Sequence, residues 1–365
     1  MQNALSDSAF QVTIDVHWGG ICGTDLHEYI SGPMTINRPE KPHGITGDHM
    51  PVSFGHEFCG RVSALPSGYR GDRFKIGTPI IVDPRIICRK CSNCTSGRDN
   101  ICENWGYVGL NGGGGGGAGF SEKVNIEMRM CHVLPEDDQS VELGSVVLCQ
   151  PLTVGRHAMS ASGIKDFAGL KVLVLGGGPV GLAVLLNLRA KGLGKGLSGR
   201  VFVSEPTAKR SEMIRRLDLS DDILNPKEVD VVKECRSRTN DHGVDVVFDT
   251  AGAESAMLAG MESLRPRGAY VNIAGWKQPF TIPMQYAMFR EITIKFSLGN
   301  NDDDYREVVE DFVAGKFAGA EALVTRRLPV EDLAEKGLEE LVRNKDDHVK
   351  IIATWRRDLL DKHKL

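Results

Sequence analysis

The stretch of residues 172–191 constrains the fold most. Residues 172–175 form a short apolar run with β-branched members, which predicts a buried parallel strand. Gly176, Gly178 and Gly181 follow in a G-x-G-x-x-G pattern, and residues 182–191 have a helical composition. The glycine pattern alone is weak, but a strand before it and a helix after it supply the context in which such a turn holds the pyrophosphate of a dinucleotide.

The chain after this turn continues to alternate between strands and helices. Mostly apolar strands are expected at 201–203, 244–248 and 269–273, with helical stretches between them. This order predicts an α/β fold with a doubly wound parallel sheet of the Rossmann type.

Glu205 stands at the end of the second predicted strand. A carboxylate there can accept hydrogen bonds from both hydroxyls of the adenosine ribose and would repel a 2′-phosphate, so it favours NAD over NADP. Lys209 and Arg210 leave a second interpretation open, because basic side chains nearby could accommodate that phosphate. They could equally form the solvated face of a charged helix at 208–217.

Four of the nine cysteines are closely spaced, in the pattern C-x2-C-x2-C-x7-C; they are Cys88, Cys91, Cys94 and Cys102. Four thiolates at this spacing can close a tetrahedral, structural zinc site with no open position. Two disulfides or free thiols are the less favoured alternative, and a nucleic-acid-binding zinc ribbon would look similar locally. The lone cysteines, Cys59, Cys131, Cys149 and Cys235, are expected to be small buried hydrophobic residues.

Cys22 belongs to a second group of metal-binding residue types. It follows a predicted strand at 10–16, and the sequence His56-Glu57 comes later. A thiolate, an imidazole and a carboxylate are enough for a catalytic zinc with one position left for water or substrate. A His-Glu pair alone is more often a buried histidine with a charged neighbour, but its combination with Cys22 and the four-cysteine group favours a metal.

The overall composition excludes other classes of protein. The 365 residues carry 44 Lys plus Arg and 48 Asp plus Glu, a net charge of −4, and no basic stripe interleaves with aromatics, so no nucleic-acid partner is expected. The longest stretch without polar side chains, at 172–186, is shorter than the roughly 20 residues of a membrane-spanning helix. The first ten residues lack the features of a secretion signal. We therefore expect a cytoplasmic protein without a membrane partner.

These motifs together resemble the zinc-dependent medium-chain alcohol dehydrogenases, most closely the butanediol and sorbitol dehydrogenase branch. The similarity runs from about residue 10 to the C-terminus. It implies a mostly β, GroES-like catalytic domain at 1–153 and 297–365, with 349–354 returning as a strand to the first piece, and an NAD-binding Rossmann domain at 154–296. It also implies two zinc ions per chain, NAD as cofactor and a homo-oligomer.

The resemblance assigns roles to individual residues. Cys22, His56 and Glu57 would face the catalytic zinc, and Asp25 would orient the zinc-bound histidine. Thr24 and His27 match the family's proton relay, and a hydroxyl and an imidazole suit proton transfer near neutral pH. The alternative is that Thr24 caps a helix and His27 is a solvated surface residue.

Gln150 departs from the family pattern, which usually has Glu before this proline. Either Gln150 or Glu57 completes the zinc sphere, and we expect Glu57, since a carboxylate is the better zinc ligand. The chain also starts close to its first predicted strand, where relatives carry a further stretch, and residues 112–117 are six glycines that form a lid or a flexible turn.

The sequence therefore predicts a zinc-dependent oxidoreductase that transfers a hydride between NAD and a small-molecule secondary alcohol, diol or polyol, or the corresponding ketone. A non-catalytic or impaired relative that binds NAD and zinc is the alternative. Its supports are Gln150 and the short N-terminal region.

Overall fold

The computed structural model describes residues 10–136, 141–276 and 279–361. By their contacts, these residues fall into two units. The first consists of the described residues of Met1–Gln150, Phe312–Ala314 and Ala320–Leu365, and the second of those of Pro151–Asp311 and Gly315–Gly319.

The first unit is built mainly from strands. Its large sheet has the order β14-β15-β1-β2-β3-β7, with β6 also paired to β1, and a small sheet joins β4 to β5. The strands are β1 (Gln11–Gly20), β2 (Glu57–Ala64), β3 (Pro79–Val82), β4 (Arg85–Ile86), β5 (Gly106–Tyr107), β6 (Lys123–Glu127), β7 (Cys131–Val133), β14 (Val324–Pro329) and β15 (Lys350–Thr354). Its helices are α1 (Gly23–Ser31), α2 (Ser92–Thr95), α3 (Leu143–Val146), α11 (Glu340–Arg343) and α12 (Arg357–Asp361).

Strand β1 organises this unit. Its positions alternate between more exposed and buried from Gln11 to Val16, residues 16–20 are all buried, and Val12 and Ile14 are fully buried in the core with Phe58 of β2. Strand β15 pairs antiparallel with β1, with Gly20 opposite Ile352. The expected return of the C-terminal strand to the first piece of the chain is therefore observed, and it places both ends of this unit's sequence at one sheet.

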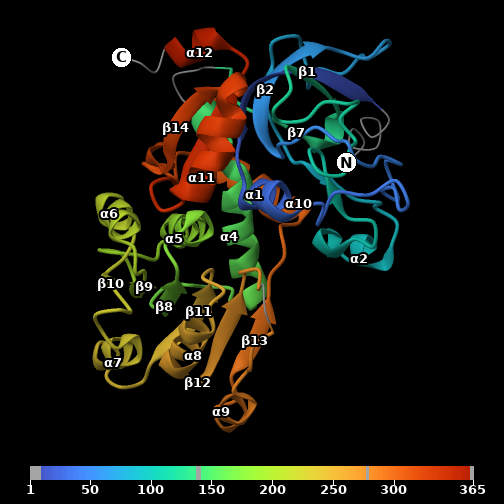
Figure 1. Ribbon diagram of the computed structural model, residues 1–365. Coiled ribbons are helices and arrows are strands. Elements are labelled where there is room, and N and C mark those ends of the chain that lie inside the picture. Colours follow the sequence, from blue (N-terminus) through green and yellow to red (C-terminus); the bar gives the residue numbers. More distant parts are fainter. Residues whose placement is uncertain (1–9, 137–140, 277–278, 362–365) are drawn as a thin grey trace. The chain divides into compact units, whose positions relative to one another are not determined.

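The second unit has a six-stranded parallel sheet in the order β10-β9-β8-β11-β12-β13. The strands are β8 (Lys171–Leu175), β9 (Arg200–Ser204), β10 (Asp222–Leu224), β11 (Val244–Asp249), β12 (Leu264–Asn272) and β13 (Thr293–Phe296). Figure 1 shows the helices that alternate with them along the chain; the helices of the chain from Cys149 to Val313 are α4 (Cys149–Ser162), α5 (Pro179–Ala190), α6 (Ala208–Arg216), α7 (Val231–Ser237), α8 (Glu254–Ser263), α9 (Met284–Phe289) and α10 (Asp302–Val313). The predicted doubly wound sheet is confirmed.

Two details differ from the sequence expectations. Helix α5 begins at Pro179 rather than at residue 182, because proline's fixed φ suits the first position of a helix. The contacts also group residues 297–311 and 315–319 with the second unit, whereas the sequence analysis expected the nucleotide-binding domain to end at 296. Arg156 of α4 contributes to this grouping, because it is buried and binds Glu307 and Asp311 of α10 at 2.7 and 2.6 Å.

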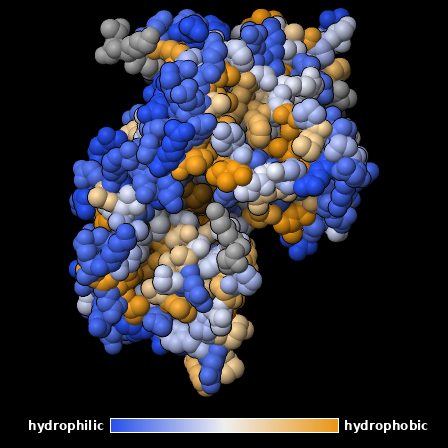
Figure 2. Space-filling model, viewed as in Figure 1, coloured by the Kyte–Doolittle hydropathy of each residue, from blue (hydrophilic) through white to orange (hydrophobic). Residues whose placement is uncertain are grey.

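The surface seen in Figure 2 is mostly hydrophilic, with scattered hydrophobic patches. Within the described ranges, no helix has the length and apolar character needed to cross a membrane.

Candidate functional site

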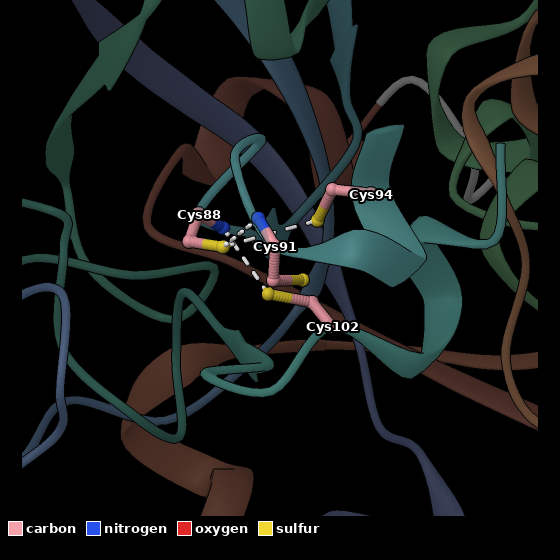
Figure 3. Close-up of side chains that lie close together, drawn as sticks. All are labelled: Cys88, Cys91, Cys94 and Cys102. Atoms are coloured by element: carbon pink, nitrogen blue, oxygen red, sulfur yellow. Dashed lines mark hydrogen bonds between the residues drawn. The ribbon is translucent and has the colours of Figure 1, made fainter. Parts of the chain in front are cut away.

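The four closely spaced cysteines converge on one point. Their sulfur atoms all lie within 4.8 Å of one another, and Figure 3 shows the four side chains pointing inward from the loop around α2. The backbone N–H of Cys88 donates to Cys102 Sγ at 3.2 Å, and that of Cys91 donates to Cys88 Sγ at 3.4 Å. Backbone N–H groups of the cysteines themselves therefore donate to the sulfur atoms, and these hydrogen bonds stabilise the turns of the loop.

The electrostatics of this lobe fit a cation. N–H groups of Lys90 and Cys91 lower the pKa of the Cys88 thiol, and those of Glu103 and Cys94 lower the pKa of Cys91 to about 6. Burial and hydrogen bonds with neighbouring thiols instead raise the pKa of Cys94 to about 12. Two of the sulfurs thus favour the thiolate form, and a cation is needed before all four can ionise together.

A buried ion-pair network anchors the lobe. Arg85 of β4 is 3% exposed and binds Asp83 at 2.5 Å and Asp99, which lies between Cys94 and Cys102, at 2.6 Å. Because a buried guanidinium needs both partners, this network fixes the lobe to the sheet.

Cys22, His56 and Glu57 form the second group, and their ligand atoms also lie within 4.8 Å of one another. Cys22 is the residue that precedes helix α1, and its N–H donates to Asp25 Oδ2 at 2.8 Å. Asp25 Oδ1 lies 3.4 Å from His56 Nδ1, with both side chains 1% exposed. Asp25 therefore holds both the turn that carries Cys22 and the ring of His56.

The three residues fit a zinc ion. Ligand atoms around tetrahedral zinc lie about 3.4–3.8 Å apart, so a small contraction would close the group on a metal. Complete burial opposes protonation of His56, but the charges of Asp25 and Cys22 outweigh it and hold the pKa of the imidazole well above its usual range. Glu57 is fully buried, and its Oε1 has no hydrogen-bond partner in the described chain. These groups are arranged to receive positive charge.

The two relay candidates occupy different environments. Thr24 is half-buried, with its Oγ1 3.8 Å from Cys22 Sγ. His27 lies one turn further along α1, on the same side as Thr24, and is exposed. In the described residues the two side chains share no hydrogen bond, so the structure places only Thr24 beside the cluster.

Gln150, at the start of α4, is 3% exposed and hydrogen-bonds with the side chain of Tyr107. The ring of Tyr107 in turn stacks on His56. Gln150 is thereby linked to the metal group through Tyr107.

The six-glycine run at 112–117 is tied down at several points. Gly113 N donates to Asp48 Oδ2, Ser53 Oγ donates to Gly116 O, and Asn125 N donates to Gly114 O. The segment is therefore a structured turn that packs on the loop before His56, which favours a turn over a lid.

The glycine-rich turn of the second unit has the geometry that a phosphate site needs. Gly176 has φ +92°, a left-handed value that favours glycine, and a Cβ on Gly181 would lie 2.0 Å from the carbonyl oxygen of Gly176. Gly178 immediately precedes helix α5, so the N–H groups of its first turn are available to an anion.

Glu205 and Arg210 flank this turn. Glu205 is 2% exposed, and its two oxygens accept the N–H groups of Gly177 at 2.6 Å and Thr207 at 2.7 Å. A Cβ on Gly178 would lie 3.7 Å from Arg210 Nη1. The carboxylate thus anchors the glycine turn, and each oxygen keeps a lone pair for a further donor.

Sequence reasoning missed two residues of the first site, Tyr107 and Lys350. Lys350 Nζ lies 2.5 Å from Glu57 Oε2. The available signal for Lys350 was a lysine at the start of an apolar strand, and that for Tyr107 was an aromatic residue soon after the fourth cysteine. Neither signal is specific.

The chain matches two families, each over about a third of its length. Residues 8–136 match the family described as "Alcohol dehydrogenase GroES-like domain", and residues 179–314 match "Zinc-binding dehydrogenase".

Curated proteins and solved structures agree with these matches. An (R,R)-butanediol dehydrogenase of Neisseria gonorrhoeae is 34% identical over 93% of this chain and 91% of its own length, and a sorbitol dehydrogenase of Bacillus subtilis is 27% identical over 94% and 89%. The crystal structure of 2R,3R-butanediol dehydrogenase from Bacillus subtilis superposes with a TM-score of 0.83 at 31% identity, covering 95% of this chain and 92% of that one. A zinc-binding dehydrogenase from Sinorhizobium meliloti bound to NADP superposes with a TM-score of 0.77 at 26% identity, covering 94% and 92%. The chain belongs to the zinc-binding alcohol dehydrogenases.

Proposed function

We propose that this dehydrogenase interconverts a vicinal diol such as 2,3-butanediol, or a related polyol, with the matching ketone, using NAD. The convergence of Cys22, His56 and Glu57 beside the half-buried Thr24 carries the proposal. The similarity to butanediol dehydrogenases over nearly the whole chain supports the substrate class.

The residues of the first unit would have three separate roles: binding the catalytic zinc, transferring the proton and binding the structural zinc. Cys22, His56 and Glu57 would hold the zinc, which when bound acts as a Lewis acid toward the substrate oxygen. Thr24 Oγ1 would accept the proton of the substrate hydroxyl as its own hydroxyl proton leaves toward the exposed imidazole of His27, which would pass that proton to water. Cys88, Cys91, Cys94 and Cys102 would hold a second, structural zinc. Because the three ligands of the first site converge without Gln150, this residue gives no support to a non-catalytic relative.

The second unit would bind the dinucleotide. Gly176, Gly178 and Gly181, together with the N-terminus of α5, would hold the pyrophosphate, with Arg210 beside this turn. Glu205 would accept hydrogen bonds from the ribose hydroxyls and disfavour a 2′-phosphate. The NADP seen in the Sinorhizobium neighbour makes a direct comparison of the two cofactors necessary.

A substrate panel tests the proposal. The zinc-loaded protein is assayed with NAD and with NADP against (R,R)-, (S,S)- and meso-2,3-butanediol, sorbitol and 2-butanol. We expect turnover with NAD and a butanediol isomer, and reduction of acetoin with NADH. Protein that carries both zinc ions and binds NAD, yet oxidises none of these alcohols, would contradict the proposal.

We also propose that the chain forms a homo-oligomer through strand β13. This strand is the edge of its sheet in the described residues, and the segment around it exposes large apolar side chains by 54–73%: Met284, Met288, Phe289, Phe296 and Leu298. A second copy related by a twofold axis would cover these side chains and continue the sheet. Light scattering should show a dimer or larger species that Phe296→Lys dissociates, whereas the matched exposed control Ile76→Lys does not; a monomeric wild-type protein would overturn this.

A cytoplasmic location is proposed as well. All nine cysteines lie in the described residues and are free thiols, as is usual in a reducing compartment.

A further inference from the structure

Lys350 is a buried ammonium group directed at a proposed metal ligand. It lies in β15, is 3% exposed, and its Nζ donates to Glu57 Oε2 at 2.5 Å and to the carbonyl oxygen of Ile21 at 3.0 Å. The pair is almost completely buried, with side-chain exposures of 3% for Lys350 and 0% for Glu57. The ammonium group is therefore held inside the protein as the ion-pair partner of Glu57.

The two oxygens of Glu57 have different surroundings. Oε2 accepts from Lys350, whereas Oε1 is buried without a hydrogen-bond partner in the described residues. A carboxylate oxygen of Glu57 lies within 4.8 Å of the ligand atoms of Cys22 and His56. One oxygen is thus occupied by an ammonium group, and the other is left for a metal.

The backbone makes room for this pair. A Cβ on Gly20 would lie 2.5 Å from Glu57 Oε2 and 3.4 Å from Lys350 Cδ. Gly20 stands opposite Glu57 on one side and opposite Ile352 on the other, so three strands meet at the pair. Only glycine at position 20 lets the carboxylate and the ammonium group sit at this junction.

The charges imply a role beyond filling space. A thiolate from Cys22 and a carboxylate from Glu57 would neutralise a divalent ion, and Lys350 adds a positive charge behind the carboxylate. We propose that Lys350 is a positioning residue that restricts Glu57 to one metal-facing oxygen and weakens the hold of the site on its ion. The ion then carries less electron density than it would if Cys22, His56 and Glu57 bound it without Lys350 nearby. This inference rests on the proposed role of Glu57 as a metal ligand.

Zinc release tests the inference without any substrate. The zinc-loaded protein is mixed with a chelator that reports zinc by absorbance, and the four-cysteine zinc serves as the internal reference. In Lys350→Met the catalytic zinc should leave more slowly, on the order of 10- to 100-fold, because a positive charge that repels the ion and competes for Glu57 has been removed. Lys350→Arg keeps the charge and should release zinc at about the wild-type rate. Equal or faster release from Lys350→Met would show a merely structural role and overturn the proposal.

A second comparison covers the case in which Lys350→Met does not fold. Glu57→Gln leaves the ammonium group unpaired beside the ion, whereas Glu57→Gln combined with Lys350→Met is a neutral pair of similar shape. We expect the single variant to lose zinc at least about tenfold faster than the double variant, because its unpaired ammonium group repels the ion. Equal zinc-release rates in the two variants would mean that the charge of Lys350 does not affect the ion, which would overturn the proposal. Because both experiments follow the metal, they remain decisive if the protein acts on an alcohol other than a diol.

Discussion

The ring of Tyr107 lies flat against the imidazole of His56, with 5.1 Å between the ring centroids and 8° between the planes. Trp105 packs edge-on against Tyr107, with 4.6 Å between the ring centroids. Both aromatics follow directly after Cys102, so the segment that leaves the four-cysteine lobe supports a proposed ligand of the other metal. The four-cysteine lobe and the group of Cys22, His56 and Glu57 are therefore linked by side-chain packing within one unit.

Substitutions of Tyr107 should reveal this contact. Tyr107→Ala removes a buried ring, and we expect a loss of about 3–5 kcal/mol in unfolding free energy together with a lower content of catalytic zinc. Tyr107→Phe keeps the stacking and loses only the hydrogen bond with Gln150, at a cost of about 1 kcal/mol. Urea unfolding and metal analysis check both; an unchanged zinc content in Tyr107→Ala would show that the stacking does not support His56.

The two groups of cysteines should respond differently to replacement. Cys94→Ser breaks a closed four-sulfur sphere and should lower the melting temperature, since a structural zinc contributes folding energy. Cys22→Ser should abolish turnover while the fold is kept. Atomic absorption should find two zinc ions in the wild-type protein; one ion, or none at the four-cysteine lobe, would refute the two-site assignment.

Glu57 and Gln150 can be ranked as ligands by their alanine variants. Glu57→Ala should lose the catalytic zinc, because it removes the oxygen that faces Cys22 and His56. Gln150→Ala should keep the zinc and lose on the order of 10- to 100-fold in rate, since it removes a partner of Tyr107 rather than a ligand. The reverse pattern of metal contents would place Gln150 inside the sphere.

Glu205 should affect both cofactor choice and cofactor binding. Glu205→Ala removes the repulsion of a 2′-phosphate and also the acceptor of the Gly177 N–H, so the preference for NAD over NADP should narrow while the KM for NAD rises. Glu205→Gln keeps one acceptor oxygen and is the matched control. Wild-type protein that uses NADP better than NAD would refute the ribose argument.

His17 should make stability fall in mild acid. Burial, followed by the charges of Arg356 and Arg61, lowers the pKa of His17 to about 4. The unfolded chain binds a proton at this residue below about pH 6.5 and the folded chain does not, so unfolding free energy decreases from about pH 6.5 to pH 4, by up to ~3 kcal/mol. Urea titrations at several pH values should show this slope, and His17→Gln should flatten it. An identical slope in the variant would exclude His17 as its source.

Local sequence patterns predicted the structural features whose residues all lie within one short stretch of the chain. The glycine turn before α5 and the four-cysteine lobe each lie within one short stretch, where residue spacing alone fixes the geometry. The family and both fold types were also predicted, and the comparisons confirm them.

The contacts that complete the first site lie beyond such patterns. Glu57 and Lys350 are 293 positions apart, and only the pairing of β15 with β1 brings them together. The stacking of Tyr107 on His56 depends equally on how β5 packs against the residue that precedes β2. The sequence placed residues 297–365 in the catalytic domain, and the ion pairs that join Glu307 and Asp311 of α10 to Arg156 are likewise not visible in the sequence.

The distance along the chain between Glu57 and Lys350 also orders events during synthesis. The four cysteines leave the ribosome together and can enclose an ion at once, because their loop is short. Glu57 and Cys22 emerge early too, but their ammonium partner follows only after the entire nucleotide-binding unit has been made. Until β15 docks, Glu57 lacks its ammonium partner, so by the proposed role of Lys350 the nascent site would hold a metal more tightly than the finished enzyme. Docking of the last strand would then lower the affinity of the site for its ion.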